Sequence, residues 1–210
     1  MFEKPNGPSR GASGPAKPKG MRADARRNRE KLVEVAAAAF AEHGVQTSLE
    51  DIARTAGIGI GTLYRHFPTR EHLVEAVYRR EVDGLCQAAD VLAAERAPDQ
   101  ALEEWLRQMV AYAATKRGMM DSLRILFDTG SEIFKDSPSR ISGALERLLA
   151  SASEAGLIRR DVESADILQA MSGIYSAPDT PDWKARSLRL VSLLMDGLRS
   201  GAPNAGGRKA

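Results

Sequence analysis

The stretch Ser48–Arg70, SLEDIARTAGIGIGTLYRHFPTR, decides the fold of this chain. Its apolar residues recur at helical spacing on both sides of Gly57, so they predict two short helices joined by a tight turn. A glycine suits that turn because a Cβ is unfavourable at positive φ. The residues expected to face the shared core are Leu49, Ile52, Ala53, Ile58, Leu63 and Phe67. The pattern predicts a helix-turn-helix, whose second helix fits the major groove of DNA.

Polar residues and a proline mark the ends of these two helices. Ser48 or Thr47 precedes the first one, with Glu50 or Asp51 placed to close a capping box. Pro68 limits the second helix, because the residue before a proline disfavours helical geometry. The two helices are therefore expected to be short and sharply bounded.

The chain between residues 21 and 200 has helical periodicity almost throughout, and no stretch alternates as a strand would. We predict an all-α fold of about nine helices, with an N-terminal three-helix helix-turn-helix domain before a C-terminal antiparallel helical bundle. A proline near a capping residue predicts helix starts at Pro98–Asp99, Ser137–Pro138 and Thr180–Pro181. The expected boundaries are a disordered arm over 1–20, the first domain over 21–75, the second over 76–200 and a disordered tail over 201–210.

Composition excludes several classes of protein. Of the 210 residues 43% are hydrophobic and 28% are charged, which is ordinary for a globular protein. No apolar run approaches the ~20 residues that cross a bilayer, and the first residues do not form a secretory signal, so we expect a cytoplasmic protein without a membrane partner. A single cysteine, Cys86, excludes an internal disulfide and a cysteine-based zinc site. Neither a metal site nor a cofactor is expected.

Charge is distributed unevenly along the chain. Residues 1–80 hold 14 basic and 9 acidic side chains, whereas residues 81–210 hold 16 basic and 19 acidic ones. The imbalance indicates an anionic partner at one end of the protein. A basic segment, Arg22–Lys31, lies just before or within the first helix. It can lie along phosphates or enter a minor groove, and the alternative is a solubilising tail.

The motif is similar to the DNA-binding domain of the TetR (tetracycline-repressor-like) family. The resemblance is carried by DIA at 51–53, AGI at 56–58, GTLYRHF at 61–67 and REHL at 70–73. It covers about residues 27–78, and the rest of the chain matches only in length and helical pattern. The resemblance implies that residues 76–200 bind a ligand and form a dimer.

The resemblance also implies roles for individual residues. Ser48 would meet a phosphate through its hydroxyl and the helix N-terminus, while Tyr64 and His66 would grip phosphates. Arg65 is the expected base-specific donor, and Arg70 stands where the family usually has a phosphate-binding lysine. With the basic segment, the expected DNA-contacting residues are Arg26, Ser48, Ile60, Gly61, Thr62, Tyr64, Arg65, His66 and Arg70.

Two positions depart from the family pattern. Gly59 stands where a capping serine or threonine is usual, so the second helix should begin without a side-chain cap. Ile60 stands at a position that is often polar, and it would either touch a thymine methyl group or pack with Leu63.

The second domain carries Met and aromatic residues at helical spacing, which are core residues by default. Such side chains also line adaptable apolar pockets, and the resemblance implies a small-molecule cavity among these helices. The pocket candidates are Trp105, Met109, Tyr112, Met120, Phe127, Met171 and Tyr175. Core packing remains the alternative for each of them.

The last helix, Trp183–Leu198, is apolar nearly all round, so it must be covered on several sides. A fully internal helix is one explanation. The resemblance implies another, a homodimer in which the last two helices of each subunit form a four-helix bundle. The interface candidates are Ile167, Met171, Ile174, Leu190, Leu194 and Leu198.

These observations predict a sequence-specific DNA-binding transcriptional regulator. The preferred hypothesis is a homodimeric repressor that a small, largely apolar ligand releases from double-stranded operator DNA. The alternatives are a regulator without small-molecule control, an activator, and a helical enzyme or lipid carrier. No catalytic motif supports an enzyme, and Gly57, Gly59 and Gly61 lack the strand and spacing of a nucleotide loop.

Overall fold

The computed structural model describes residues 19–175 and 180–203, and this part of the chain contains nine α-helices, one short 3₁₀-helix and no strand. The predicted all-α fold is therefore confirmed. The helices are α1 (Lys19–His43), η1 (Gly44–Gln46), α2 (Leu49–Ala56), α3 (Ile60–His66), α4 (Arg70–Glu95), α5 (Pro98–Gly118), α6 (Met120–Asp128), α7 (Ile133–Glu154), α8 (Ser164–Tyr175) and α9 (Trp183–Arg199).

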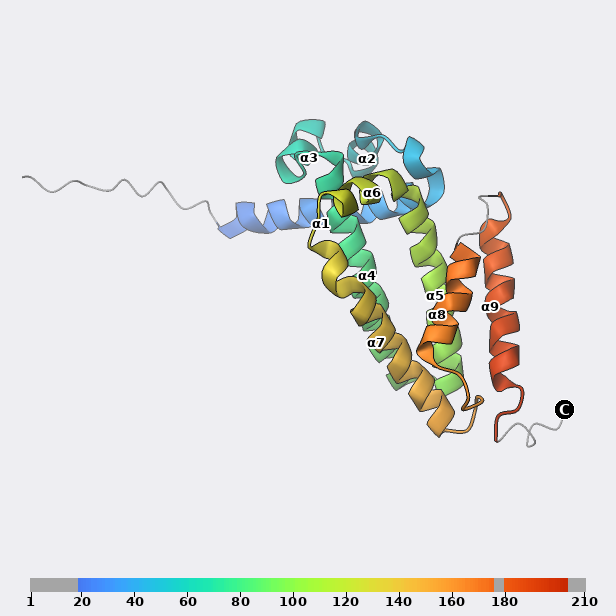
Figure 1. Cartoon of the computed structure of the whole chain (residues 1–210). Coiled ribbons are helices and arrows are strands. Elements are labelled where there is room, and N and C mark those ends of the chain that lie inside the picture. Colours follow the sequence, from blue (N-terminus) through green and yellow to red (C-terminus); the bar gives the residue numbers. More distant parts are fainter. Residues whose placement is uncertain (1–18, 176–179, 204–210) are drawn as a thin grey trace, which may run out of the picture.

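The helices form a head and a body, which Figure 1 shows at two ends of the molecule. The head is made of α1, α2 and α3, and the body of α4 to α9. Within the body α4, α5 and α7 pack on one another, α6 contacts α4 near the head, and α9 packs on α5. The expected division at residue 75 falls inside α4, so one continuous helix belongs to both parts.

The first helix begins earlier than the apolar stripe indicates. α1 starts at Lys19, so the basic segment is helical, and the last two residues of the expected arm, Lys19 and Gly20, belong to that helix. Arginine and alanine before Leu32 are good helix formers, which accounts for the longer helix. The rest of the expected arm, residues 1–18, and residues 204–210 of the expected tail lie outside the described residues.

The start of α7 differs from its prediction. The helix begins at Ile133 and contains Pro138, which the sequence placed at its first turn. Gly130, at φ 71°, ends the preceding turn, and the buried Ile133 begins the new helix against the core. The hydroxyl of Ser137 donates a hydrogen bond to the Ile133 carbonyl at 2.6 Å instead of capping the helix.

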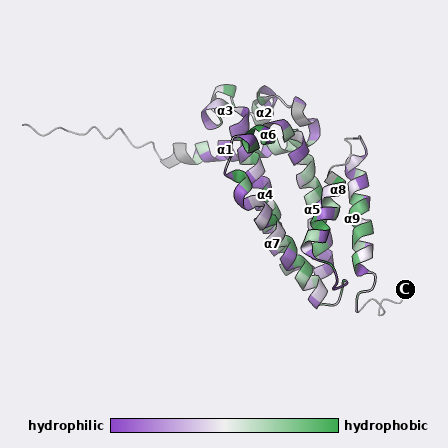
Figure 2. Ribbon diagram, in the orientation of Figure 1, coloured by the Kyte–Doolittle hydropathy of each residue, from purple (hydrophilic) through white to green (hydrophobic). Residues whose placement is uncertain are grey.

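The core extends from the head through the body. In Figure 2, α9 carries hydrophobic residues along much of its length, whereas α3 is largely hydrophilic. Trp105 is fully buried, and its indole N–H donates to the carbonyl of Leu85 at 2.8 Å. This bond satisfies the polar atom of a large core side chain and joins α5 to α4.

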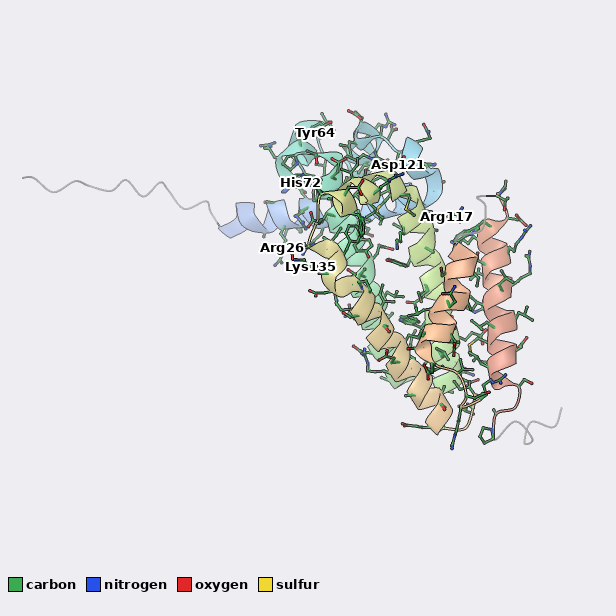
Figure 3. All side chains as sticks on the ribbon, in the orientation of Figure 1. Arg26, Tyr64, His72, Arg117, Asp121 and Lys135 are labelled. Atoms are coloured by element: carbon green, nitrogen blue, oxygen red, sulfur yellow. The ribbon has the colours of Figure 1, made fainter. Side chains whose placement is uncertain are left out.

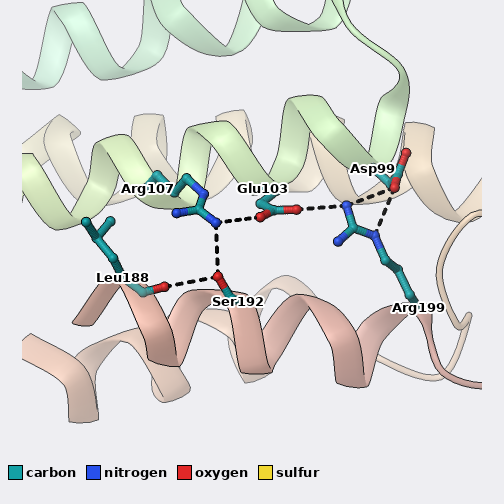
Figure 4. A network of polar contacts seen from close by, with 6 residues as sticks. All are labelled: Asp99, Glu103, Arg107, Leu188, Ser192 and Arg199. Atoms are coloured by element: carbon teal, nitrogen blue, oxygen red, sulfur yellow. Dashed lines mark hydrogen bonds and ion pairs between the residues drawn. The ribbon is translucent and has the colours of Figure 1, made fainter. Parts of the chain in front are cut away.

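A polar network attaches α9 to the other side of α5 (Figure 4). Asp99 is 2% exposed, and the Arg199 guanidinium contacts both Asp99 and Glu103 at 2.9 Å. Glu103 also accepts from Arg107 at 2.7 Å, and Arg107 donates to the Ser192 hydroxyl at 2.9 Å. Partly buried, shared ion pairs of this kind fix geometry better than single exposed pairs do.

The head meets the body at a contact between two backbones. A Cβ built on Gly118, the last residue of α5, would lie 1.9 Å from the carbonyl oxygen of Phe40 and 3.1 Å from the Cα of Gly44. No side chain therefore fits at this position. The end of α5 rests directly on the end of α1.

We predict that Gly118→Ala destabilises the protein by about 2–3 kcal/mol, because the added methyl group has to displace backbone atoms. Gly143→Ala is the matched control, since the nearest atom to its new Cβ is 4.0 Å away in a flexible arginine side chain. The control should stabilise by about 0.5–1 kcal/mol, the usual gain for glycine to alanine within a helix. Urea denaturation at one protein concentration measures both, and equal stability of the two variants would refute the contact.

Candidate nucleic-acid interface

Ser48 caps α2 as predicted, but the Asp51 carboxylate accepts from the Ser48 hydroxyl and not from the backbone N–H as in a capping box. The backbone N–H of Asp51 donates to Ser48 Oγ at 3.0 Å, and the Ser48 hydroxyl donates to Asp51 Oδ2 at 2.7 Å. This bond and the neighbouring Arg54 hold the pKa of the Asp51 carboxyl below its usual value. Of the two predicted caps Ser48 is therefore the one used, and it fixes the start of α2.

The turn between α2 and α3 follows the predicted glycine geometry. Gly57 has φ 66°, and the N–H of Ile58 donates to the carbonyl of Ala53 at 2.9 Å, closing the end of α2. Leu63 and Phe67 are at most 1% exposed and pack into the head. The residues of α3 between these two anchors are consequently turned outward.

The outer face of α3 carries apolar, aromatic and charged side chains. Ile60 is 38% and Tyr64 44% exposed, Arg65 is exposed, and Figure 3 shows Tyr64 pointing away from the body. Arg65 donates from Nε to the Gly61 carbonyl at 3.2 Å and from Nη2 to the Thr62 hydroxyl at 2.8 Å. These bonds lie within one helix, so the Arg65 side chain is held along α3 and its outer edge stays accessible.

The beginning of α3 departs from the family pattern as expected. Gly59 precedes the helix and offers no side-chain cap, although its carbonyl accepts from the N–H groups of Thr62 and Leu63 at 2.8 and 3.2 Å. A Cβ on Gly61 would meet nothing within 4 Å, so the glycine leaves a flat, open surface beside Tyr64.

His66 lies at the end of α3 and is only partly exposed. Burial lowers the pKa of its imidazole, and the charges of Arg29 and Arg65 lower it further. The ring is therefore mainly neutral at pH 7. It can donate one hydrogen bond to a phosphate but adds little positive charge unless a phosphate approaches.

Arg70, the expected phosphate ligand at the start of α4, also has a structural role. Its Nη1 donates to the carbonyl of Thr47 at 2.6 Å, and its guanidinium lies 5.1 Å from the centre of the Phe40 ring. The Thr47 hydroxyl in turn donates to the Ala39 carbonyl at 3.0 Å. These contacts join α4, the cap of α2 and the end of α1, and they place Arg70 beside Ser48.

Thr47, one of the two predicted caps, and Arg29, in the basic segment, make contacts in the head that the sequence did not predict. Thr47 is buried because its hydroxyl bonds to α1, and Arg29 lies 5.1 Å from the centre of the Phe67 ring. The Thr47 bond spans eight residues across the 3₁₀-helix and the Arg29 contact joins α1 to the end of α3, so helical spacing within one element reveals neither. Arg26, the predicted contact on α1, is exposed and pairs with Glu30 at 3.6 Å.

Comparisons with known proteins match both parts of the chain. The family model described as bacterial regulatory proteins, tetR family, matches residues 32–77, and the model described as the SbtR-like transcriptional regulator C-terminal domain matches residues 97–200. The crystal structure of a TetR transcriptional regulator from Streptomyces coelicolor is 45% identical, covers 81% of this chain and 98% of its own, and has a TM-score of 0.74. This chain belongs to the TetR family of transcriptional regulators.

Other relatives agree with this assignment. A TetR regulatory protein from Mycobacterium vanbaalenii is 36% identical over 85% of this chain and 99% of its own, with a TM-score of 0.67. A curated HTH-type transcriptional regulator of Staphylococcus aureus is 45% identical over 64 residues. That alignment spans 30% of this chain and 35% of the relative, so it covers about a third of the curated protein.

The pocket candidates of this TetR regulator occupy different environments. Trp105, Met109 and Met171 are at most 3% exposed and Tyr112 is 7% exposed, whereas Met120 is 48% and Phe127 68% exposed on α6. The side chain of Tyr175 lies outside the described residues. Tyr112 belongs to a group of aromatic rings with Tyr78 and Phe134. The ring centre of Tyr78 lies 6.4 Å from that of Tyr112 and 5.5 Å from that of Phe134. Phe127 joins the same group through Phe134, since the centres of these two rings lie 5.7 Å apart.

A half-open cleft of about 620 Å³ lies between α4 and α5, with Tyr112 in its wall. Its lining also includes apolar, amide and charged residues, namely Leu85, Gln87, Gln108, Arg80, Glu81 and Asp83. Burial raises the pKa of the Glu81 carboxyl, although a hydrogen bond with Thr115 and the charge of Arg80 act in the opposite direction. The cleft therefore combines an apolar wall with several hydrogen-bonding groups.

An apolar groove of about 510 Å³ runs between α8 and α9. Five of the six interface candidates line it, namely Ile167, Ile174, Leu190, Leu194 and Leu198. Met171 is fully buried within the subunit and is not in the lining. Leu193, which is 66% exposed, was not among the candidates although it belongs to the apolar pattern of the helix.

The described residues offer neither a metal site nor a membrane-spanning helix. No group of three or more His, Cys, Asp or Glu side chains there could hold a metal ion. None of the helices in this part of the chain combines the length and apolar character that crossing a membrane requires.

The contrast between Arg70 and Arg65 gives a testable prediction. Arg70→Gln removes a charge-assisted hydrogen bond to a partly buried carbonyl and should lower the free energy of unfolding by about 2 kcal/mol. Arg65→Gln changes an exposed side chain that bonds only within its own helix, so its effect on stability should stay within about 0.5 kcal/mol. Urea denaturation distinguishes them, and an equal loss in both variants would show that the bond to Thr47 does not stabilise the head.

Proposed function

We propose that this TetR-family regulator is a homodimeric repressor, which a small molecule releases from its operator. The observation that carries the proposal is the outer face of α3, where Tyr64 and Arg65 are exposed beside the open backbone of Gly61. Two such faces, held at a fixed separation by a dimer, suit a roughly palindromic operator. The proposed site of action is the cytoplasm.

The residues of α3 divide into two proposed roles. Arg65 reads bases, because a guanidinium at the edge of a major-groove helix matches the two acceptors of guanine. Ile60 and Thr62 lie on the same short helix and contact bases or the adjacent backbone. Tyr64 and His66 bind phosphates, which fix the register of the head on the duplex.

The proposed phosphate contacts continue at the start of two other helices. Ser48 lies at the N-terminus of α2, where free backbone N–H groups favour an anion. Arg70 is partly exposed beside it. Its Nη1 donates to the Thr47 carbonyl, and the other N–H groups of the guanidinium can approach a phosphate. Gly61 supports the proposal because its missing side chain lets a DNA backbone approach α3 closely.

The proposed dimer forms through the groove between α8 and α9. Leu190 and Leu193 expose apolar surface there, which water disfavours. Ala170 and Gly197 also line the groove, so a second helix can approach closely. The opposite side of α9 is held by Arg199 and Ser192, which leaves the groove face available to a second copy of the chain.

The proposed effector is a small, largely apolar molecule bound in the body. The cleft between α4 and α5 supports a site in the body, because Leu85 and Tyr112 offer apolar surface to such a molecule. The charged residues of the lining, Arg80, Glu81 and Asp83, would meet its polar groups. The effector acts only if it binds more tightly to a form whose heads are wrongly spaced. α4 is the natural connection, since it lines the cleft and continues into the head.

We predict that Tyr64→Ala weakens binding to all DNA sequences, whereas Arg65→Ala mainly relaxes specificity. Losing one bidentate hydrogen-bonded pair with a base should cost about 1–3 kcal/mol against the preferred base pair. The measurement is fluorescence anisotropy across a salt series, with DNA from the region upstream of the protein's own gene and a random duplex of equal length. Arg140→Ala, an exposed arginine on α7, is the control. A wild-type protein that binds both duplexes equally at every salt concentration would contradict operator recognition there.

The same assay tests release by a ligand. Compounds that raise the melting temperature of the protein by mass action are added to the protein–operator complex, and a repressor of the proposed type loses DNA as they bind. Stabilising compounds that leave the complex intact would favour a regulator without small-molecule control.

We predict that Leu193→Glu separates the dimer into folded monomers. A carboxylate left unpaired in an apolar interface is costly, and the dissociation constant should rise by roughly a hundredfold or more. Val91→Glu is the matched control, because Val91 is 45% exposed on α4 and outside the groove. Sedimentation velocity measures both variants. Dimers of equal strength in both would place the subunit interface elsewhere.

A further inference from the structure

The first turns of α1 protrude from the head. Figure 1 shows the beginning of this helix extending beyond α2 and α3. None of the side chains from Ala23 to Lys31 is buried, and Leu32 is the first to enter the core. A helix that is polar on all sides gains nothing from packing. The protruding half, residues 19–31, thus offers the side chains of residues 23–31 to a partner outside the subunit.

The protruding half is basic. Residues 19–31 contain six lysines and arginines and two acidic residues. Arg26 and Arg29 are three residues apart, and Arg29 lies four before Val33 and seven before Ala36, which are buried. By helical periodicity these two arginines continue the face that α1 turns toward the rest of the head.

Arg29 locates this face relative to the recognition helix. Its guanidinium lies 5.1 Å from the centre of the Phe67 ring, and Phe67 directly follows α3. Its charge also contributes to the lowered pKa of His66. The basic face of α1 is thus next to the end of α3 where phosphate contacts are proposed.

The ion pairs of this segment are easily exchanged. Arg26 pairs with Glu30 at 3.6 Å with side chains that are 77% and 60% exposed, and Arg27 pairs with Asp24 at the surface. Exposed pairs of this kind contribute about 0–1 kcal/mol. A phosphate can replace these carboxylates at little cost.

We propose that residues 19–31 of α1 lie along the DNA phosphate backbone that flanks the major groove entered by α3. The sequence leaves open whether this segment lies along phosphates or enters a minor groove. Its helical form decides between the two. A helix is about 10 Å or more in diameter, whereas the minor groove is about 6 Å wide, so this segment does not read bases there. Its contribution is affinity without sequence preference. The proposal rests on the proposed function in that α3 is the recognition helix.

The test compares Arg26→Gln/Arg29→Gln with the matched double variant Arg140→Gln/Arg147→Gln, which removes two exposed arginines from α7. Anisotropy is measured across a salt series on two 40-base-pair duplexes, one random and one from the upstream region. The α1 variant should weaken binding to both duplexes by the same factor. Its salt slope should fall by about 0.9 for each phosphate that the variant no longer neutralises, while the α7 variant keeps the wild-type slope. Melting curves check that both variants fold.

Other outcomes overturn the proposal. An α1 variant with wild-type slope and affinity would show that the segment does not touch DNA. A third duplex, the random one with its flanks replaced by A·T pairs, is measured beside them, and a weakening confined to it would show minor-groove reading instead. The proposed function is tested separately by Tyr64→Ala on the upstream duplex. If the wild type shows no preference for that duplex, operator recognition there fails, but the slope on the random duplex still decides the role of α1.

Discussion

The head rests on the body where two backbones meet with no side chain between them, at Gly118 and the carbonyl of Phe40. The space there does not admit a methyl group, so the end of α5 and the end of α1 are fixed at contact distance. Met119 and α6 follow directly, and α6 also packs on α4. A shift of α5 or α6 is therefore passed to the head without being absorbed by a soft layer of side chains.

Arginines supply both the internal order of this molecule and its charged surface. Arg199 holds α9 to buried Asp99, and Arg70 holds α4 to the Thr47 carbonyl. Arg65 and Arg26, by contrast, have only neighbours within their own helices and remain exposed. Arginine thus serves both to hold helices together and to charge the surface. Charge counts place the basic surface in the first part of the chain, but they do not say which arginines are available to contact DNA.

Local signals in the sequence predicted the local structure. The Ser48 cap, the Gly57 turn and the buried Leu63 follow from spacing and from the allowed backbone conformations of single residues. Contacts between distant segments were not predictable in this way: the Arg70 bond to Thr47 spans 23 residues. Periodicity also identifies an apolar face without saying what covers it, and Phe127, a pocket candidate, is 68% exposed on α6. Pro138 was expected at a helix start because Ser137 precedes it as a candidate cap, but the helix begins earlier, at the buried Ile133.

The polar network between α5 and α9 has a consequence for how operators diverge. α5 touches the head through Gly118 and holds the proposed dimer helix through Asp99 and Glu103, so it connects the proposed DNA-reading surface to the proposed subunit interface. In the proposed dimer, a substitution in α5 changes the distance between the two heads while the proposed base contacts of α3 stay the same. On this proposal the spacing of the operator half-sites evolves separately from their sequence, and related regulators with the same α3 distinguish operators by spacing alone.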